Sequence, residues 1–423
     1  MRMIFFVTLA FALCASHGDA AGFEKSVMWS GKHAGYAGAA VSGVTGGQSL
    51  FFNPAGLAGP GDVSLNYSPT WINIEGNLAS VGKKEESKVG PLPFAGLTAS
   101  YNFGRFGFGM GAYVVGGEKA YFGGVDLTGD SVIRFKPALI TDLEITEYSL
   151  GAAMEVVSGL RFGASWRINK AKGELSTIKK TVTNTAYSFL YVKDVKQTMY
   201  DGWRLGVQYE SSEKNWGLGF GYRSRVTFDA PGTGFGQTIV IPTQTITPQV
   251  LSDVVRVGVI FPEAYNLGMH YVAAQNLKLL AGLDLVKYSK TDSINITGTA
   301  NGTTLPNIPL NWHDMWNIRF GMEYTGMNSL ALRAGYALTT QTTSSEHAKA
   351  TLPPAGKGHL VVVGAGYSIG KNLDLDGAIE HSWNNGSGSM SLPTSTTKEL
   401  LAGVNTESKV KVYAFHTGLT YKF

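Results

Sequence analysis

The chain ends in the stretch "VYAFHTGLTYKF" (residues 412–423), in which two kinds of side chain alternate. Successive side chains of an extended strand point to opposite sides, so every second residue shares a face. One face carries the apolar residues Tyr413, Phe415, Leu419, Tyr421 and Phe423. The other face carries His416, Gly418, Thr420 and Lys422. This period of two predicts a β-strand with one apolar and one polar face, ending on an aromatic residue.

The same period recurs along most of the chain, for example at residues 203–209, 216–222, 316–324 and 330–336. Aromatic residues gather near the ends of these segments, as the two interfaces of a membrane barrel require. We expect fourteen strands, at residues 61–72, 92–103, 105–116, 147–157, 159–171, 196–211, 214–227, 253–273, 276–290, 312–325, 328–340, 357–369, 371–384 and 408–423. The predicted fold class is therefore all-β, a 14-stranded antiparallel transmembrane β-barrel.

The thirteen connections between the expected strands alternate between two lengths. Six are tight turns, near residues 102–104, 158–159, 211–214, 274–276, 326–328 and 370–372. Seven are long, and they include residues 117–146, 172–195, 228–252, 291–311, 341–356 and 385–407. Short turns at one rim and long loops at the other are typical of barrels of the bacterial outer membrane, with the long loops outside the cell.

Residues 253–273 can be read as one strand or as two strands around Pro262. Two strands would give an odd total, whereas single-chain bacterial barrels have even numbers of strands. The apolar residues from Val255 to Tyr271 keep one phase through the proline. We therefore expect one long strand that bends at Pro262.

Composition excludes several classes of protein. Charged residues are 16% of the chain, below the roughly 25% of soluble proteins. The net charge is only +4 and there is no long basic run, so we expect no nucleic-acid partner. The only cysteine is Cys14, which excludes a disulfide. We also expect no cofactor and no metal.

Residues 1–20 have the pattern of an export signal. Arg2 is followed by an apolar stretch up to Ala15, and small residues precede a cleavage point after Ala20. Beyond it no apolar run is long enough for a membrane-spanning helix. The expected location is the outer membrane of a Gram-negative bacterium.

The polar face of the expected strands carries charges of both signs. They are Glu147, Glu155, Arg161, Arg167, Arg204, Glu210, Arg223, Arg256, Asp284, Arg319, Glu323, Arg333, Asp374, Asp376 and Glu380. Isolated charges are unfavourable in an apolar medium, so these side chains need partners or water in the lumen. Two interpretations remain: a network of ion pairs that braces the barrel, or a ligand site at individual arginines.

Glycine repeats at every second position in two of the strands. Gly107, Gly109 and Gly111 form one row, and Gly217, Gly219 and Gly221 form the other. This spacing, inside strands, differs from that of glycine-rich nucleotide loops. Because all six point inward, they leave room for another backbone to pack closely, or allow the strand to bend.

Residues 21–60 are rich in Gly and Ala and contain the turn "FFNPAGLA" (51–58). Pro fixes the backbone while Asn and Gly tolerate a tight turn, so the segment is compact but too short to fold alone. A barrel of fourteen strands leaves an open channel unless something fills it. We expect residues 21–60 to form a plug inside the barrel of residues 61–423.

The turn, together with blocks at 201–224, 261–289 and 315–338 and the closing "TGLTYKF", resembles the FadL family of outer-membrane transporters for long-chain fatty acids. Relatives of the TodX type carry aromatic hydrocarbons. The resemblance implies that the plug is the family's hatch, with Asn53, Pro54, Ala55 and Gly56 as its motif. It further implies passive uptake of a hydrophobic compound, with exit sideways into the membrane at a kink in strand three, which we place at Gly107, Gly109 and Gly111.

The resemblance also implies basic residues for a substrate carboxylate. The candidates in this sequence are Arg167, Lys170, His313 and Arg319. The stretch "NIPLNWHDMWNIR" (307–319), which leads into the tenth strand, contains no lysine. An uncharged hydrocarbon therefore remains an alternative substrate. The expected partners are a hydrophobic small molecule and the lipid or lipopolysaccharide of the outer membrane, and we expect a monomer.

Two other functions share parts of this pattern. A general diffusion porin would narrow its pore with a folded loop rather than with an N-terminal plug. An outer-membrane lipase or protease would need a catalytic constellation at one rim, but the eight histidines are scattered and neither HExxH nor GxSxG occurs. We therefore expect a transporter and not an enzyme.

Overall fold

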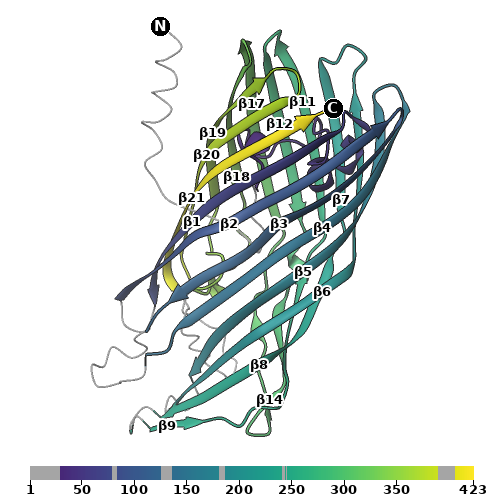
Figure 1. The fold of residues 1–423 in the computed structure, drawn as a ribbon. Coiled ribbons are helices and arrows are strands. Elements are labelled where there is room, and N and C mark those ends of the chain that lie inside the picture. The colour runs from purple at the N-terminus through teal and green to yellow at the C-terminus, as the bar shows by residue number, and fades with distance from the viewer. Residues whose placement is uncertain are drawn as a thin grey trace.

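The computed structural model describes residues 29–78, 83–124, 136–180, 186–240, 243, 245–388 and 405–423. The expected export signal lies outside these residues. The chain forms a closed antiparallel barrel of tilted strands, with a group of short helices inside it (Figure 1). The barrel closes because β1 (Asp62–Leu78) pairs with β21 (Asn405–Lys422) along most of their lengths. The all-β prediction is confirmed.

Sixteen of the strands build the wall. Besides β1 and β21 they are β2 (Lys83–Phe103), β3 (Phe106–Phe122), β4 (Leu139–Val157), β5 (Leu160–Lys180), β6 (Ala186–Glu210), β7 (Trp216–Arg223), β8 (Val226–Val240), β10 (Val255–Phe261), β11 (Ala264–Ala274), β12 (Leu277–Val286), β17 (Met315–Met327), β18 (Leu330–Thr339), β19 (Gly358–Ile369) and β20 (Leu373–Gly386). β7 and β8 together make one barrel strand, and β10 and β11 together make the next. The two barrel strands are neighbours, because β8 pairs with β10 and β7 pairs with β11. The wall therefore has the fourteen strands that the sequence predicts.

Smaller elements lie in the long connections. They are β9 (Thr245–Pro248), β13 (Ser293–Thr297), β14 (Thr299–Ala300), β15 (Thr303–Thr304) and β16 (Ile308–Pro309), with the short 3-10 helices η2 (Tyr288–Lys290) and η3 (Ser345–His347). β9 and β14 lie at the end of the barrel opposite the C-terminus (Figure 1). The tight turns lie at the C-terminal end.

Several strands extend further toward the long loops than the sequence predicts. β5 and β6 were expected to end and begin at residues 171 and 196, but they remain paired out to Lys180 and Tyr187. β4 likewise begins at Leu139 rather than at residue 147. In these extensions the exposed side includes charged residues such as Glu144 and Lys172, while apolar residues such as Phe189 are buried, so the alternation that marks a lipid-facing strand is absent there.

The outer face of the barrel between the two rims is apolar. Its side chains include Tyr101, Phe103, Phe108, Met110, Leu150, Leu218, Phe220, Leu267, Phe320, Ile379 and Phe415, all of them exposed. Phe103, for example, is 71% exposed. Such a large exposed apolar surface is unfavourable in water but favourable against lipid.

The break at Pro262 changes the direction of the side chains, which the sequence analysis did not predict. Phe261 is 5% exposed and points inward, whereas Leu267, in the same alternating series, is 52% exposed and points outward. Proline cannot donate to the ladder, and pairing is interrupted between Phe261 and Ala264, so the phase shifts. The expectation of a single phase is therefore wrong. The same shift places Arg256 on the outer surface, paired with Asp229 at 3.1 Å, and not in the lumen.

Residues 29–61 lie inside the barrel. They form α2 (Gly31–Ala34), α3 (Ser49–Phe52) and the 3-10 helix η1 (Pro54–Ala58), drawn in purple in Figure 1. α2 lies against β19, β20 and β21, while η1 lies against β3, β4, β5 and β6. None of the helices in the described part of the chain is long and apolar enough to cross a membrane. We call residues 29–61 the hatch.

Candidate functional site: the hatch, the lumen and an opening in the wall

Asn53 attaches the hatch to the barrel wall. Its side-chain oxygen accepts from the backbone N–H of Ala55 at 3.2 Å and so caps η1, in which Pro54 takes the first position. Its amide nitrogen lies 3.0 Å from the carbonyl oxygen of Val207 on β6 and 3.2 Å from that of Phe220 on β7. Asn53 is completely buried. The four residues of the expected hatch motif thus form one buried turn against the wall.

Inward-facing glycines of the barrel receive the hatch backbone. A Cβ added to Gly107 on β3 would lie 1.7 Å from the carbonyl oxygen of Leu57, and one on Gly163 would lie 2.3 Å from Pro54. Similar contacts with the hatch backbone occur at Gly219 and Gly335, and at Gly206 the added Cβ would meet the side chains of Asn53 and Pro54. Contacts below 3.0 Å are sterically impossible without movement, so only glycine allows the hatch to lie this close. This is the first of the two roles that the sequence left open for the glycine rows.

Polar side chains of the wall also donate to hatch carbonyl groups. Gln208 donates to Val41 and Val44, at 3.0 and 3.1 Å. Asn102 donates to Ala58 at 2.9 Å, and Arg319 to Ala37 at 3.0 Å. Barrel and hatch are therefore joined by hydrogen bonds as well as by packing.

Replacing Asn53 by alanine tests this attachment. The change removes the cap of η1 and leaves the buried carbonyls of Val207 and Phe220 without this donor, so we expect a loss of about 1–3 kcal/mol in hatch stability. Limited proteolysis within the hatch measures it, with Asn215→Ala at an exposed turn as the control. A hatch as resistant as that of the wild type would contradict the assignment.

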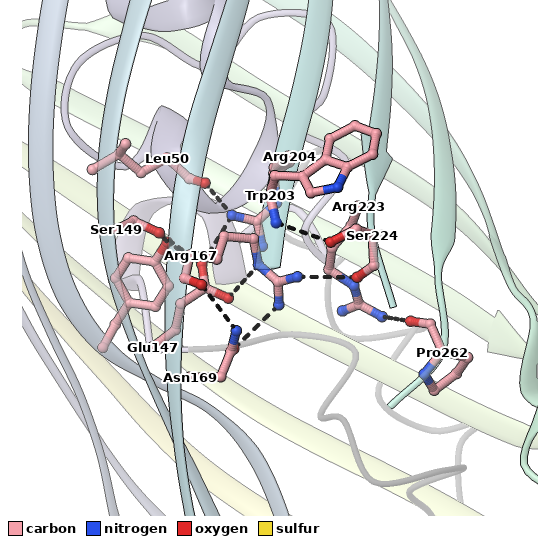
Figure 2. A network of polar contacts seen from close by, with 11 residues as sticks. Leu50, Glu147, Ser149, Arg167, Asn169, Trp203, Arg204, Arg223, Ser224 and Pro262 are labelled. Atoms are coloured by element: carbon pink, nitrogen blue, oxygen red, sulfur yellow. Dashed lines mark hydrogen bonds and ion pairs between the residues drawn. The ribbon is translucent and has the colours of Figure 1, made fainter. Parts of the chain in front are cut away.

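A buried cluster of charged groups lies beside the hatch (Figure 2). Glu147 on β4 is completely buried and accepts from Arg167 Nε at 2.7 Å and from Arg204 Nη1 at 3.0 Å. The hydroxyl groups of Tyr113 and Ser149 each donate to the same carboxylate at 2.8 Å. The carboxylate thus balances two guanidinium groups that come from two other strands.

Arg204 connects this cluster to the hatch. It donates to the carbonyl oxygen of Leu50 as well as to Glu147, and its guanidinium lies 5.6 Å from the ring centre of Phe51. A cavity of about 80 Å³ adjoins it. The cavity is lined by Gly38, Val41, Phe51, Phe52, Arg204, Arg223, Ala264, Asn266, Asp284, Val286, Met315, Asn317 and Arg319. Arg204 therefore lines this cavity and also contacts the hatch.

The four candidate residues for a substrate carboxylate are not brought together. Arg167 lies in the lumen but is bound to Glu147, Asn169 and the carbonyl oxygen of Ser224. Arg319 also lies in the lumen, with both Nε and Nη2 on Asp284 at 2.7 and 2.6 Å. Lys170 is exposed on the outer face of β5, and His313 is exposed in a connection. The structure assembles no clamp from these four.

Most of the other lumen charges are paired in the same way. Arg333 binds Glu323 at 2.7 Å and Asp376 at 2.6 Å, and Arg161 binds Glu155 at 3.1 Å. This pattern supports the interpretation of the lumen charges as a network that braces the wall.

His33 and Gln48 hold the two parts of the hatch together. The ring Nδ1 of His33 lies 2.5 Å from Gln48 Oε1 and 2.9 Å from Ser30 Oγ. Burial, with a smaller contribution from neighbouring Lys32, lowers the pKa of His33 to about 3. The imidazole is therefore neutral at neutral pH and serves as a hydrogen-bonding group.

The wall opens between β2 and β3. The two strands pair without interruption from Phe103 and Phe106 to Gly96 and Tyr113, and no further pairs follow in the described residues. Beyond this point β3 stays paired with β4, with a register shift between Val114 and Gly116. At the far end of the gap, Ser87 Oγ accepts from the N–H of Tyr121 at 2.8 Å.

A cavity of about 140 Å³ occupies the opening. It is lined by Ile72, Leu92, Pro93, Phe94, Val114, Gly116, Gly117, Glu118, Lys119, Asp142, Leu143 and Glu144. We call this cavity the portal. On the lumen side of the portal, Trp29 of the hatch stacks on Tyr113, with ring centres 5.0 Å apart. Trp29 also packs against Gly96. The hatch thus contacts β3 at Tyr113, the residue that precedes Val114 of the portal.

The irregular part of β3 lies further along the strand than the sequence analysis placed it. Gly107, Gly109 and Gly111 are in regular register with β2 and β4 and contact the hatch instead. The irregularity begins at Val114, next to the glycine pair Gly116 and Gly117. Gly117 has a φ of +155°, which few other residues adopt. The adjacent glycine pair in "VVGGEK" is the signal that could have located it.

Between the hatch and the long loops, the interior of the barrel is apolar. Val226, Phe228, Val257, Val259 and Phe261 of β8 and β10 point inward and pack against Tyr288, Ile294, Ile308, Leu310 and Trp312 of the connection between β12 and β17. This apolar interior was not predicted, because the apolar face of β10 was expected to contact lipid. The described residues contain no group of three or more His, Cys, Asp or Glu side chains that could hold a metal ion.

Comparison with known proteins identifies a matching family and several solved structures with a similar fold. Residues 11–423 match the family described as outer membrane protein transport protein (OMPP1/FadL/TodX). No curated protein matches the sequence. Among solved structures, a Pseudomonas aeruginosa FadL homologue is similar, with a TM-score of 0.76 and 17% identity over 95% of this chain and 100% of that one. The P. putida toluene transporter TodX gives a TM-score of 0.70 and 16% identity, over 94% of this chain and 99% of that one.

A third similar structure is that of the CymD monoaromatic hydrocarbon channel, with a TM-score of 0.69 and 14% identity over 95% of this chain and 99% of that one. Identities this low establish the fold alone, whereas the family match covers nearly the whole sequence. The chain therefore belongs to the OMPP1/FadL/TodX family of outer membrane transport proteins.

Proposed function

We propose that this outer-membrane transporter takes up uncharged hydrophobic compounds by diffusion and releases them sideways into the membrane through the portal. The observation that carries the proposal is the end of pairing between β2 and β3, where a cavity lined by apolar and charged side chains lies in the wall. The long-loop side offers the apolar interior of β8 and β10 as the way in.

Sideways release is favoured by the physical chemistry of such a substrate. Each methylene that leaves an apolar phase for water costs about 0.8 kcal/mol, so a watery exit past the hatch would be strongly uphill. A path from apolar loops to lipid keeps the substrate out of water throughout. No coupling to an energy source is needed, because the substrate moves down its own gradient.

The arginines favour an uncharged substrate over a fatty acid. Arg167 and Arg319 already bind protein carboxylates, and Lys170 and His313 point elsewhere. A fatty-acid carboxylate would have to displace Glu147 or Asp284 to find a cation. The toluene transporter and the monoaromatic hydrocarbon channel among the similar structures support the same choice.

A polar-solute porin fits less well, because the hatch is joined to the lumen wall by hydrogen bonds from several strands. An enzymatic function is not favoured either, since the family consists of transport proteins.

Filling the portal tests the proposal. Val114 lines the cavity, so Val114→Trp should occupy it without touching the charged cluster. We expect uptake of labelled decane, by cells that lack other transporters of this family, to fall several-fold. The control is Leu218→Trp, which places the same indole side chain on the lipid-facing side of β7, away from the portal. Equal uptake by the Val114 variant and the wild type would overturn sideways release at this place.

A further inference from the structure

The portal contains one acidic side chain that has no partner. Glu118 lies in β3 opposite Leu143 of β4, in a pair that faces inward, and it lines the cavity together with Leu92 and Phe94 of β2. Among the residues that the structure describes, no hydrogen-bond donor or cation binds its carboxyl group.

The other acids of the portal differ from Glu118 in this respect. Asp142 is paired with Lys119, and Glu144 is paired with Lys172 at 3.1 Å. Both pairs lie on the outer side of the strands and are partly exposed. Two of the three portal acids are thus neutralised at the outer mouth, and the one on the inner side is not.

An unpartnered carboxyl in apolar surroundings is unfavourable for folding. Packing does not require it, because glutamine has nearly the same shape and leucine would suit Leu92 and Phe94 better. Groups of this kind occur mainly at functional sites, where a local disadvantage serves a chemical purpose.

We propose that Glu118 is a specificity-determining residue that keeps carboxylates and other anions from leaving through the portal. This inference rests on the proposed release of the substrate between β2 and β3. If Glu118 is ionised, an anion in the cavity lies beside a second negative charge. If Glu118 is protonated, the two groups share one proton, and one net negative charge stays buried without a cation. An alkane or an aromatic hydrocarbon can pack against Leu92, Phe94 and Leu143 and needs nothing from the carboxyl group.

The arrangement gives selectivity by disfavouring the wrong substrate, which is effective when the right one offers no group to recognise. A hydrocarbon has no hydrogen-bonding group, so the transporter cannot select it by a polar contact. It can exclude amphiphiles of the same length, which are the competitors in any mixture of hydrophobic compounds.

The test compares decane with decanoate, which differ mainly in the carboxylate. In Glu118→Gln we expect uptake of labelled decanoate to rise about fivefold, corresponding to roughly 1 kcal/mol, with decane uptake unchanged. The control Glu155→Gln removes the same charge from a position outside the portal, where Glu155 is paired with Arg161 at 3.1 Å, and should leave the ratio of the two substrates as in the wild type. An unchanged ratio in Glu118→Gln, or an equal change in both variants, would overturn the inference.

The failure of this inference can be told from the failure of the proposed function. If Val114→Trp leaves the uptake of decane intact, release through the portal is wrong and Glu118 has no substrate to select. If Val114→Trp lowers decane uptake but Glu118→Gln leaves the ratio unchanged, release through the portal stands and only the role of Glu118 is wrong. The amount of each folded barrel is measured by the shift in gel mobility on heating.

Discussion

Replacing Glu147 by alanine is expected to lower the free energy of unfolding by about 3–5 kcal/mol, because it leaves two buried guanidinium groups without their shared carboxylate. Arg167 and Arg204 are each 4% exposed, so water cannot take over the role of Glu147. The hydroxyl group of Tyr113 loses its acceptor at the same time. Urea titration of the barrel in detergent, followed by tryptophan fluorescence, measures the loss.

The same substitution should also loosen the hatch. Arg204 holds the carbonyl oxygen of Leu50 while Glu147 fixes its orientation, so an unpaired Arg204 no longer presents the donor in the same place. The control is Glu155→Ala, since Glu155 pairs with Arg161 at a site where its side chain is 29% exposed, and the expected change there is below about 1 kcal/mol. Equal losses in the two variants would mean that the Glu147 cluster has no special role.

A second variant separates loss of charge balance from loss of packing. Changing Glu147, Arg167 and Arg204 together to leucine and methionine removes the whole charged group, and buried ion pairs replaced in this way often leave stability unchanged or improved. We expect this triple variant to regain much of the lost stability while its hatch stays loose. Recovery of stability without recovery of the hatch would show that the cluster serves to position Leu50.

The sequence predicted the wall wherever the strands touch lipid. In β7, β11, β17 and β21 the contrast between lipid and lumen imposes a strict period of two, and these strands were located to within a few residues. Beyond the apolar belt that contrast disappears. The ends of β4, β5 and β6 beyond this belt were therefore expected to be loops, although backbone pairing continues the ladder there and side chains such as Ile178 and Phe189 are buried in an apolar cluster.

The hatch motif was predictable because its chemistry is local. Asn53 and Pro54 cap and begin η1 within four residues of sequence, and the turn reads directly from their types. The Glu147 cluster was not predictable as a unit, because its members come from β3, β4, β5 and β6 and only the register of these four paired strands brings them together. Lys170 does not join Arg167 in the lumen as a candidate for binding a carboxylate. The two residues are close in sequence, but the three-residue spacing puts Lys170 on the opposite face of the strand.

A single methyl group on Gly206 is expected to displace the hatch. The Cβ of alanine at this position would lie 1.9 Å from Asn53 Oδ1 and 2.8 Å from the Cδ of Pro54. Asn53 cannot give way easily, because its nitrogen is tied to the carbonyls of Val207 and Phe220. Overpacking of this kind costs up to about 3 kcal/mol, which is roughly a hundredfold increase in the population with the hatch displaced.

The measurement is the ion conductance of single barrels in a planar bilayer, because a displaced hatch opens a polar lumen to water. The matched control is Gly282→Ala, since Gly282 also faces the hatch but an added Cβ would come no closer than 3.5 Å to Arg319 and 3.7 Å to Ala39. Both variants add one methyl group to an inward-facing glycine, and they differ only in the space available. Frequent large openings in Gly206→Ala and none in Gly282→Ala would establish that the close contact of Gly206 with Asn53 and Pro54 keeps the barrel closed, whereas silent channels in both would mean that the hydrogen bonds of the hatch suffice without it.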